Sequence, residues 1–320
     1  MLPNRFSDNE NDTPEYNTID ATLWLFDTLY KYYQKFGDAD FVKENFHHLE
    51  EIIKWHFKGT RYNIQVTNQG FLTGGEGLSQ LTWMDARIGD FVVTPRHGIP
   101  VEIQALWYNS LRVYLFFANK FSDNPAPFQN EIQQTAEKLK KNFVAYFLNE
   151  KGYLNDVVQE DKSADDTIRP NQIYALSLSF PILDKNAGRS ILETVDKHLF
   201  TPLGLRTLSP EHPDFRPVYE GNQWERDTAY HQGTVWPFLL ADYFKACFYV
   251  YGKTPDVLGK LKESVDTLQK HFYEEDCIHG ISEIFDGKNP SQGKGTINQA
   301  WSVSAMIQLM EMNNKLTPSR

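Results

Sequence analysis

The stretch most informative about the fold is Tyr230-His231-Gln232-Gly233-Thr234-Val235-Trp236-Pro237, followed directly by Phe238-Leu239-Leu240-Ala241. Aromatic rings, amide and imidazole groups and a glycine stand just before an apolar run that predicts a helix. Trp and Tyr rings stack on the C–H faces of sugars, and Gln and His bond hydroxyl groups, so the stretch suits a carbohydrate cleft. A proline-bounded turn whose rings pack into a core would have the same composition, and both interpretations stay open at this point.

The composition excludes several classes of protein. A net charge of −10 over 320 residues argues against a nucleic-acid partner or an anionic membrane surface, because phosphate groups require a basic face. No apolar run approaches the length of a membrane span, and the N-terminus lacks a signal-peptide pattern, so a cytoplasmic location is expected by default. Cys247 and Cys277 lie far apart without metal-ligand spacing. We therefore expect no zinc site, no disulfide framework and no cofactor.

Hydrophobic periodicity is helical almost throughout, and aromatic-rich helices alternate with amphipathic ones rich in Lys and Glu. We expect inner and outer helices of successive hairpins, in a single all-α domain over residues 1–320. Asp20 is expected to cap the first helix, and a short hairpin is predicted at 62–66 and 71–72. The predicted helices cover residues 20–36, 40–58, 102–121, 128–149, 170–179, 186–200, 232–251, 254–273 and 298–313.

Long polar segments precede the inner helices, so they should gather at one end of the helical barrel, where function would be built. They cover residues 73–100, 152–169, 202–229 and 274–297. Two of them hold a carboxylate among apolar neighbours, Asp85 in Leu81–Ala86 and Glu283 in Ile281–Phe285. Such surroundings raise a carboxyl pKa, and two carboxyls facing each other across a sugar are the minimum equipment for glycosidic hydrolysis. Either acid could instead be a helix cap or the partner of a nearby Arg.

Further motifs follow one another along the chain. They are Pro3-Asn4-Arg5-Phe6, Tyr16-Asn17-Thr18-Ile19-Asp20-Ala21, Thr82-Trp83-Met84-Asp85-Ala86, Pro100-Val101-Glu102-Ile103-Gln104-Ala105-Leu106-Trp107-Tyr108-Asn109, Arg169-Pro170-Asn171-Gln172, Gly204-Leu205-Arg206-Thr207-Leu208, Arg226-Asp227-Thr228-Ala229-Tyr230 with the stretch quoted first, Ser282-Glu283-Ile284-Phe285-Asp286-Gly287, and Gln299-Ala300-Trp301-Ser302-Val303. Together these motifs resemble the C-terminal glucosidase domain of glycogen debranching enzymes, the amylo-α-1,6-glucosidase family. The resemblance covers essentially the whole chain.

The resemblance implies an (α/α)6 barrel, a helical toroid, that hydrolyses the single α-1,6-linked glucose at a branch point of glycogen or limit dextrin with inversion. Asp85 would be the general acid and Glu283 the general base, with their carboxyls about 6.5–9.5 Å apart. Trp83, Trp236 and Trp301 would stack on sugar rings. The expected hydroxyl contacts are Arg87, Glu102, Asn171, Gln172, Arg226, Asp227, His231 and Gln232.

The sequence differs from the family at its N-terminal end. Family members carry another hairpin or so before the segment that starts here at Met1, so we expect the toroid to lack its first hairpin or hairpins. Part of the wall of the sugar site would then come from an N-terminal portion of the same enzyme. Two alternatives remain. One is another inverting (α/α)6 glycosidase, similar to trehalases, glucosidases or neutral invertases, and the other is an inactive glucan-binding fragment.

Overall fold

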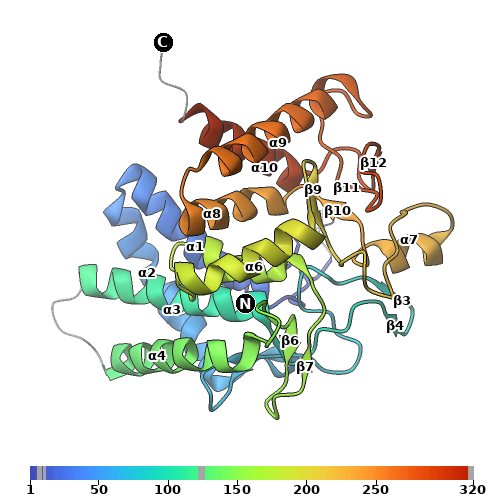
Figure 1. Ribbon diagram of the computed structural model, residues 1–320. Coiled ribbons are helices and arrows are strands. Elements are labelled where there is room, and N and C mark those ends of the chain that lie inside the picture. Colours follow the sequence, from blue (N-terminus) through green and yellow to red (C-terminus); the bar gives the residue numbers. More distant parts are fainter. Residues whose placement is uncertain (6–8, 10–11, 122–126, 316–320) are drawn as a thin grey trace.

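A computed structural model describes residues 1–5, 9, 12–121 and 127–315. Phe6 of the first motif lies outside the described residues. Within them the helices alternate between inner and outer positions, which confirms the expected toroid-like (α/α)6 arrangement (Figure 1). The inner helices follow one another by contact and are α1 (Asp20–Phe36), α3 (Val101–Phe121), α5 (Tyr174–Ser177), α8 (Leu239–Tyr251) and α10 (Ala300–Asn314). The outer helices are α2 (Ala39–Lys58), α4 (Pro127–Phe147), α6 (Lys185–His198) and α9 (Pro255–Glu274).

The helices begin and end where local chemistry satisfies their free backbone groups. Asp38 accepts a hydrogen bond from the backbone N–H of Phe41 at the start of α2, and Thr254 accepts one from Val257 at the start of α9. Gly37 ends α1 in the left-handed conformation, with φ 68°. The predicted cap of α1 is wrong: Thr18, not Asp20, accepts the N–H of Ala21. Asp20 is instead the first helical residue.

The inner helices α3, α5 and α8 are buried on most sides, which explains why their apolar residues do not keep to one stripe. In α3, every residue from Val101 to Leu111 is buried, so no side of this part of the helix faces solvent. The outer helix α6 shows the opposite pattern, with Ile191, Leu192 and Val195 buried and its other face exposed to solvent. No helix among the described residues combines the length and the apolar character that crossing a membrane requires.

Short strands and one short helix gather at one end of the helices, on the right of Figure 1. The largest sheet is antiparallel with the order β12-β11-β10-β9-β8. In it, Val235 of β10 pairs with Phe285 of β11 and with Arg206 of β9, so three distant loops are tied together. Its strands are β8 (Phe200–Thr201), β9 (Gly204–Arg206), β10 (Val235–Trp236), β11 (Ile284–Phe285) and β12 (Gly293–Lys294).

Three smaller sheets complete this end of the molecule. The predicted hairpin is confirmed as β1 (Gln65–Val66) paired with β2 (Leu72–Thr73), after a 3-10 turn η1 (Arg61–Asn63). A second hairpin follows in the chain, and β5 pairs with the β6–β7 hairpin. These strands are β3 (Arg87–Ile88), β4 (Phe91–Val92), β5 (Ile99–Pro100), β6 (Val157–Val158) and β7 (Ala164–Asp165).

Two predicted helices are shorter than expected. The helix predicted from residue 232 begins only at Leu239, because Gly233 has φ 140° and the residues after it enter strand β10. The helix predicted at 170–179 is a 3-10 turn η2 (Pro170–Ile173) followed by the single turn α5. The helix α7 (Gln223–Ala229) lies in a segment whose composition predicts a polar loop.

Candidate active site

A cavity of about 480 Å³ opens at the end of the helices where the loops gather. Its wall comes from distant parts of the chain: the N-terminal segment and the start of α1, the loop before β3, the starts of α3 and α5, the stretch around β10 into α8, the residue before β11, and the start of α10. Five of the side chains that line it are acidic, and none is Lys or Arg among the residues that the structure describes. The acidic ones are Asp20, Asp85, Glu102, Asp242 and Glu283.

Glu283 is held firmly in the wall of this cavity. The Tyr230 hydroxyl donates to its Oε1 over 2.6 Å, and the Gln299 side chain donates to the same oxygen over 3.2 Å. The backbone N–H of Thr296 donates to Oε2 over 3.0 Å. Glu283 is only 7% exposed, and its own backbone N–H donates to the Thr296 carbonyl. A carboxylate surrounded by three donors is oriented as an acceptor and as a base.

Asp85 lies in a more open part of the same wall. Burial of the carboxyl raises the pKa of Asp85 to about 6, and the negative charges of Asp20 and Glu283 contribute to the rise. Asp20 itself lies in the cavity, where burial raises its pKa above the ordinary value. Solvent still reaches Asp85. The cavity therefore contains one carboxyl that stays partly protonated up to mildly acidic pH, with a pKa of about 6, and another that several donors hold as an acceptor.

A buried ionic network supports the cavity from behind. Arg96 contacts Glu102, and its Nε donates to Asp156 over 2.9 Å. Asn171 joins the network by donating to Asp156 over 2.7 Å, and it accepts the indole N–H of Trp83 over 2.8 Å. Glu102 and Trp83 thus reach the cavity wall in fixed orientations, because each is anchored to groups that have further partners of their own.

An aromatic wall closes another side of the cavity. Trp83 packs edge-to-face on Trp236 with ring centroids 5.3 Å apart, and Trp301 stacks on Phe238 at 4.5 Å. His231 is fully buried among these rings, and burial lowers its pKa to about 3, so the ring is neutral. Within the part of the chain that the structure describes, neither ring nitrogen of His231 has a hydrogen-bond partner. Buried polar atoms of this kind need a partner, and a ligand in the cavity would supply one.

Of the predicted site residues, the structure brings seven to this cavity, namely Trp83, Asp85, Glu102, His231, Trp236, Glu283 and Trp301. Six others lie outside it, for reasons that the contacts make plain. Asn171 supports Trp83, Gln172 accepts the backbone N–H of Leu154, and Gln232 accepts from Arg169. The remaining three are at the surface or rim, with Arg226 and Asp227 on α7 and Arg87 in an adjacent hollow beside Asp85.

Comparison with known proteins gives the family. A sequence model of the family described as Amylo-alpha-1,6-glucosidase matches residues 1–308, which is nearly the whole chain. The chain belongs to this family. The resemblance found in its sequence motifs is thereby confirmed.

This amylo-alpha-1,6-glucosidase family member is similar to a much longer yeast protein and to several solved structures. The glycogen debranching enzyme of Saccharomyces cerevisiae is 25% identical over 304 residues, covering 79% of this chain and 20% of the yeast protein. The chain therefore spans about a fifth of the length of that curated relative. A solved structure of a protein named sialidase has a TM-score of 0.64 at 16% identity, covering 95% of this chain and 27% of the other, and this likeness concerns the fold alone. A GH63 mannosylglycerate hydrolase from Thermus thermophilus has a TM-score of 0.48 at 16% identity, covering 67% of this chain and 45% of the other.

Several side chains at the cavity of this amylo-alpha-1,6-glucosidase family member are missed by reasoning from the sequence. Asp20 has the pattern of a helix cap, although it starts α1 with its side chain at the cavity. Tyr230 and Gln299 stand in motifs that the sequence does reveal, but their bonds to Glu283 depend on pairing of distant loops. Asp242 lies one turn into a helix whose predicted start is wrong. Among the described residues, no group of three or more His, Cys, Asp or Glu side chains is placed to hold a metal ion.

Proposed function

We propose that this chain is an inverting glycoside hydrolase domain that removes α-1,6-linked glucose from the branch points of glycogen-type polymers. The observation that carries the proposal is that Asp85 and Glu283, far apart in the sequence, line one cavity in environments that suit opposite proton-transfer roles. Membership of the amylo-alpha-1,6-glucosidase family supports the reaction class. The yeast relative, a glycogen debranching enzyme, supports the choice of a branched glucan as substrate.

Asp85 is proposed as the general acid. Cleavage of a glycosidic bond needs a proton on the leaving oxygen, and an acid with a raised pKa still holds that proton near neutral pH. Burial and two neighbouring carboxylates give Asp85 such a pKa, of about 6. Its open position also suits the role, because the leaving chain of the polymer has to lie on the solvent side of the cavity.

Glu283 is proposed as the general base. In an inverting hydrolysis the base removes a proton from water as that water attacks the anomeric carbon on the face opposite the leaving group. The bond from carbon to the leaving oxygen breaks while the bond to the water oxygen forms, and Asp85 gives its proton to the leaving group. Tyr230, Gln299 and the N–H of Thr296 orient the carboxylate for this task.

The chemistry of the cavity favours a neutral sugar. An anionic ligand would face five acidic side chains with no lining Lys or Arg among the described residues, so repulsion would oppose its binding. A glucose unit would find aromatic faces at Trp83, Trp236 and Trp301 for its C–H groups. We propose that His231 and Glu102 bond its hydroxyl groups, with Asp20 and Asp242 as further acceptors.

The proposal is tested by following the reaction of a dextrin whose branches are single α-1,6-linked glucose units by proton NMR. Glucose should appear, and its β-anomer should appear first, because inversion at an α-linked carbon produces β-glucose. Sucrose and trehalose serve as controls and should give no product. Initial release of α-glucose would overturn inversion. Absence of glucose from a sample that binds the dextrin would support the glucan-binding fragment instead.

A further inference from the structure

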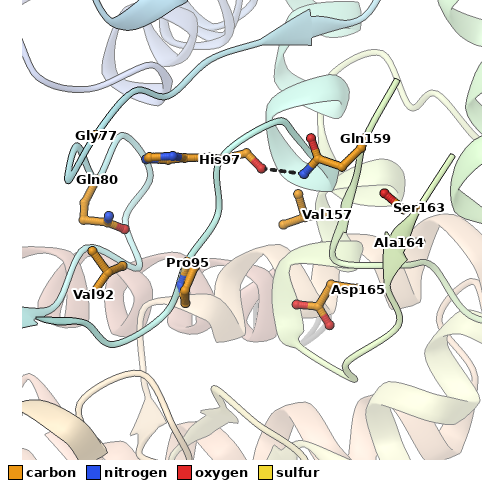
Figure 2. A pocket seen from close by; sticks show the side chains of 10 residues that line it. All are labelled: Gly77, Gln80, Val92, Pro95, His97, Val157, Gln159, Ser163, Ala164 and Asp165. Carbon is orange, nitrogen blue, oxygen red and sulfur yellow. Dashed lines mark hydrogen bonds between the residues drawn. The ribbon is translucent and has the colours of Figure 1, made fainter. Parts of the chain in front are cut away.

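Three hollows in the surface meet at one side chain, Gln80. It lines the acidic cavity described above, and it also lines two further hollows of about 450 Å³ each. The second hollow shares Asn17, Gln80 and Asp85 with the acidic cavity, so it opens directly beside the proposed general acid. The third hollow shares Gln80 with the other two, and Figure 2 shows it from close by.

The second hollow is polar and has one strained residue in its wall. Tyr62 lines it with φ 57°, a left-handed conformation that bulky residues rarely adopt. Arg87 and Glu76 line the same wall. At the boundary with the acidic cavity, the Asn17 Oδ1 atom is buried without a hydrogen-bond partner within the described part of the chain. A hydroxyl group lying across this boundary would satisfy that oxygen.

The third hollow separates the loop before α3 from the β6–β7 hairpin. In Figure 2, Gln80 and Val92 lie on one side and Ser163 and Asp165 on the other. Its lining combines apolar groups with amide, hydroxyl and carboxylate groups, and includes no Lys or Arg among the residues described. Such a lining can contact both the C–H faces and the hydroxyl groups of a neutral sugar chain, whereas it offers no cation to a phosphate.

Several contacts hold the segments around Ser79 and His97, which line the second and the third hollow respectively, in place. His97 contacts the Ser79 carbonyl oxygen over 2.6 Å, and the Gln159 side chain donates to the His97 carbonyl over 3.0 Å. The backbone of Gly75 approaches the His97 ring so closely that an added Cβ would lie 2.5 Å from it. Contacts within the protein therefore hold these segments in place, which lowers the cost of ordering the site when a ligand binds.

We infer that the second and third hollows hold the two directions of the main chain of a branched glucan, while the stub glucose occupies the acidic cavity. The inference rests on the function proposed above. A branch-point glucose has three connections: to the stub, to the preceding main-chain unit and to the following one. Three hollows that meet at Gln80, next to Asp85, match these three directions. A linear substrate would leave one of the hollows empty.

The test compares two substrates with one variant that fills the third hollow. Ser163→Trp places a large ring in this hollow at an exposed position, and Ala164→Trp does so from the neighbouring residue. The substrates are isomaltose, which has no main chain, and a maltoheptaose with one α-1,6-glucose on an internal unit. We expect the ratio of kcat/KM, branched substrate over isomaltose, to fall about tenfold in either variant, the amount that loss of a few sugar contacts produces.

Glu160→Trp is the matched control, because Glu160 is exposed in the same β6–β7 hairpin without lining the hollow, and it should leave the ratio unchanged. An unchanged ratio in both hollow-filling variants, with the unmodified protein active on both substrates, would overturn the inference while the proposed function stands. If the unmodified protein cleaves neither substrate, the proposed function fails. The inference is then decided by calorimetric binding of maltoheptaose, which Ser163→Trp should weaken and Glu160→Trp should not; equal binding by both would overturn it.

Discussion

The hydroxyl of Tyr230 donates a hydrogen bond of 2.6 Å to Oε1 of Glu283, although the two residues are 53 positions apart. The pairing of Val235 in β10 with Phe285 in β11 ties the two loops together, with Glu283 directly before β11 and Tyr230 in the turn that precedes β10. Burial and the Glu283 carboxylate raise the pKa of Tyr230 far above its ordinary value, so the hydroxyl stays a donor at every pH of interest. The proposed base is thus held in part by a donor from a distant loop, in addition to Gln299 and the N–H of Thr296.

Tyr230→Phe should therefore lower kcat on branched dextrin, because Glu283 loses its shortest donor while the aromatic packing is kept. We expect a loss of about tenfold to a hundredfold, which is less than the roughly 10²–10³-fold cost of removing a donor to a developing oxyanion, because Gln299 and the N–H of Thr296 still hold Glu283. Steady-state kinetics measures it. Tyr219→Phe is the control, since the Tyr219 ring packs on Tyr230 at 5.6 Å and its loss of a hydroxyl leaves the Tyr230–Glu283 bond in place. Equal kinetics for the two variants would contradict the role given to Tyr230.

The pH dependence of kcat/KM should follow the protonation of Asp85. A general acid works only while protonated, so kcat/KM should fall at alkaline pH, with a midpoint near the Asp85 pKa of about 6. The carboxylate of Asp20 raises that pKa, because two nearby negative charges repel. Asp20→Asn removes the charge and lowers the Asp85 pKa, so the alkaline limb should move to lower pH. If the alkaline limb of Asp20→Asn stays at the same pH, or moves to higher pH, the proposed effect of Asp20 on the Asp85 pKa is wrong. Asp242→Asn removes another cavity carboxylate, one paired with Lys245, and is the control.

The ionic network behind the cavity should be a major source of stability. Arg96 is almost fully buried between Glu102 and Asp156. Arg96→Met would leave the buried Glu102 carboxylate without its cation and Asp156 with only Arg169, 3.7 Å away, which costs about 3–5 kcal/mol of unfolding free energy. Chemical denaturation followed by circular dichroism measures this difference. The exposed pair Arg5–Glu15 is the control, and Arg5→Met should cost less than about 1 kcal/mol. A loss below about 1 kcal/mol for the buried arginine would show that the network is not needed for stability.

The long helices could be predicted from the sequence because each carries many periods of one pattern. The outer helix α9 extends over Pro255–Glu274, close to the predicted 254–273, with apolar residues on one side and Thr254 as its cap. The sheet β8–β12 could not be predicted in this way, because strands of two or three residues contain no measurable alternation. The helix α7 did have a signal, the capping box of Asn222 and Glu225, which the polar composition of its segment concealed.

The cavity could be predicted only in part for a related reason. The sequence motifs identified the loops that gather at one end of the helices, and seven of the predicted side chains line the cavity there. Which way the other side chains point depends on packing that no motif encodes. Arg226 is exposed on α7, and Gln232 turns away to pair with Arg169. Asp20, in contrast, has the sequence pattern of an ordinary residue at the start of a helix. Only the structure reveals that it lies in the cavity with Asp85.

The division of roles between Asp85 and Glu283 is tested most directly with α-D-glucosyl fluoride, whose leaving group departs without protonation. Asp85→Asn should lose about 10²–10⁴-fold in kcat/KM on branched dextrin, the contribution of a general acid, while it stays active on the fluoride. Glu283→Gln should lose activity on both substrates, because water must be activated in either case. Equal losses on dextrin and fluoride in Asp85→Asn would contradict the assignment of Asp85 as the acid that protonates the leaving group.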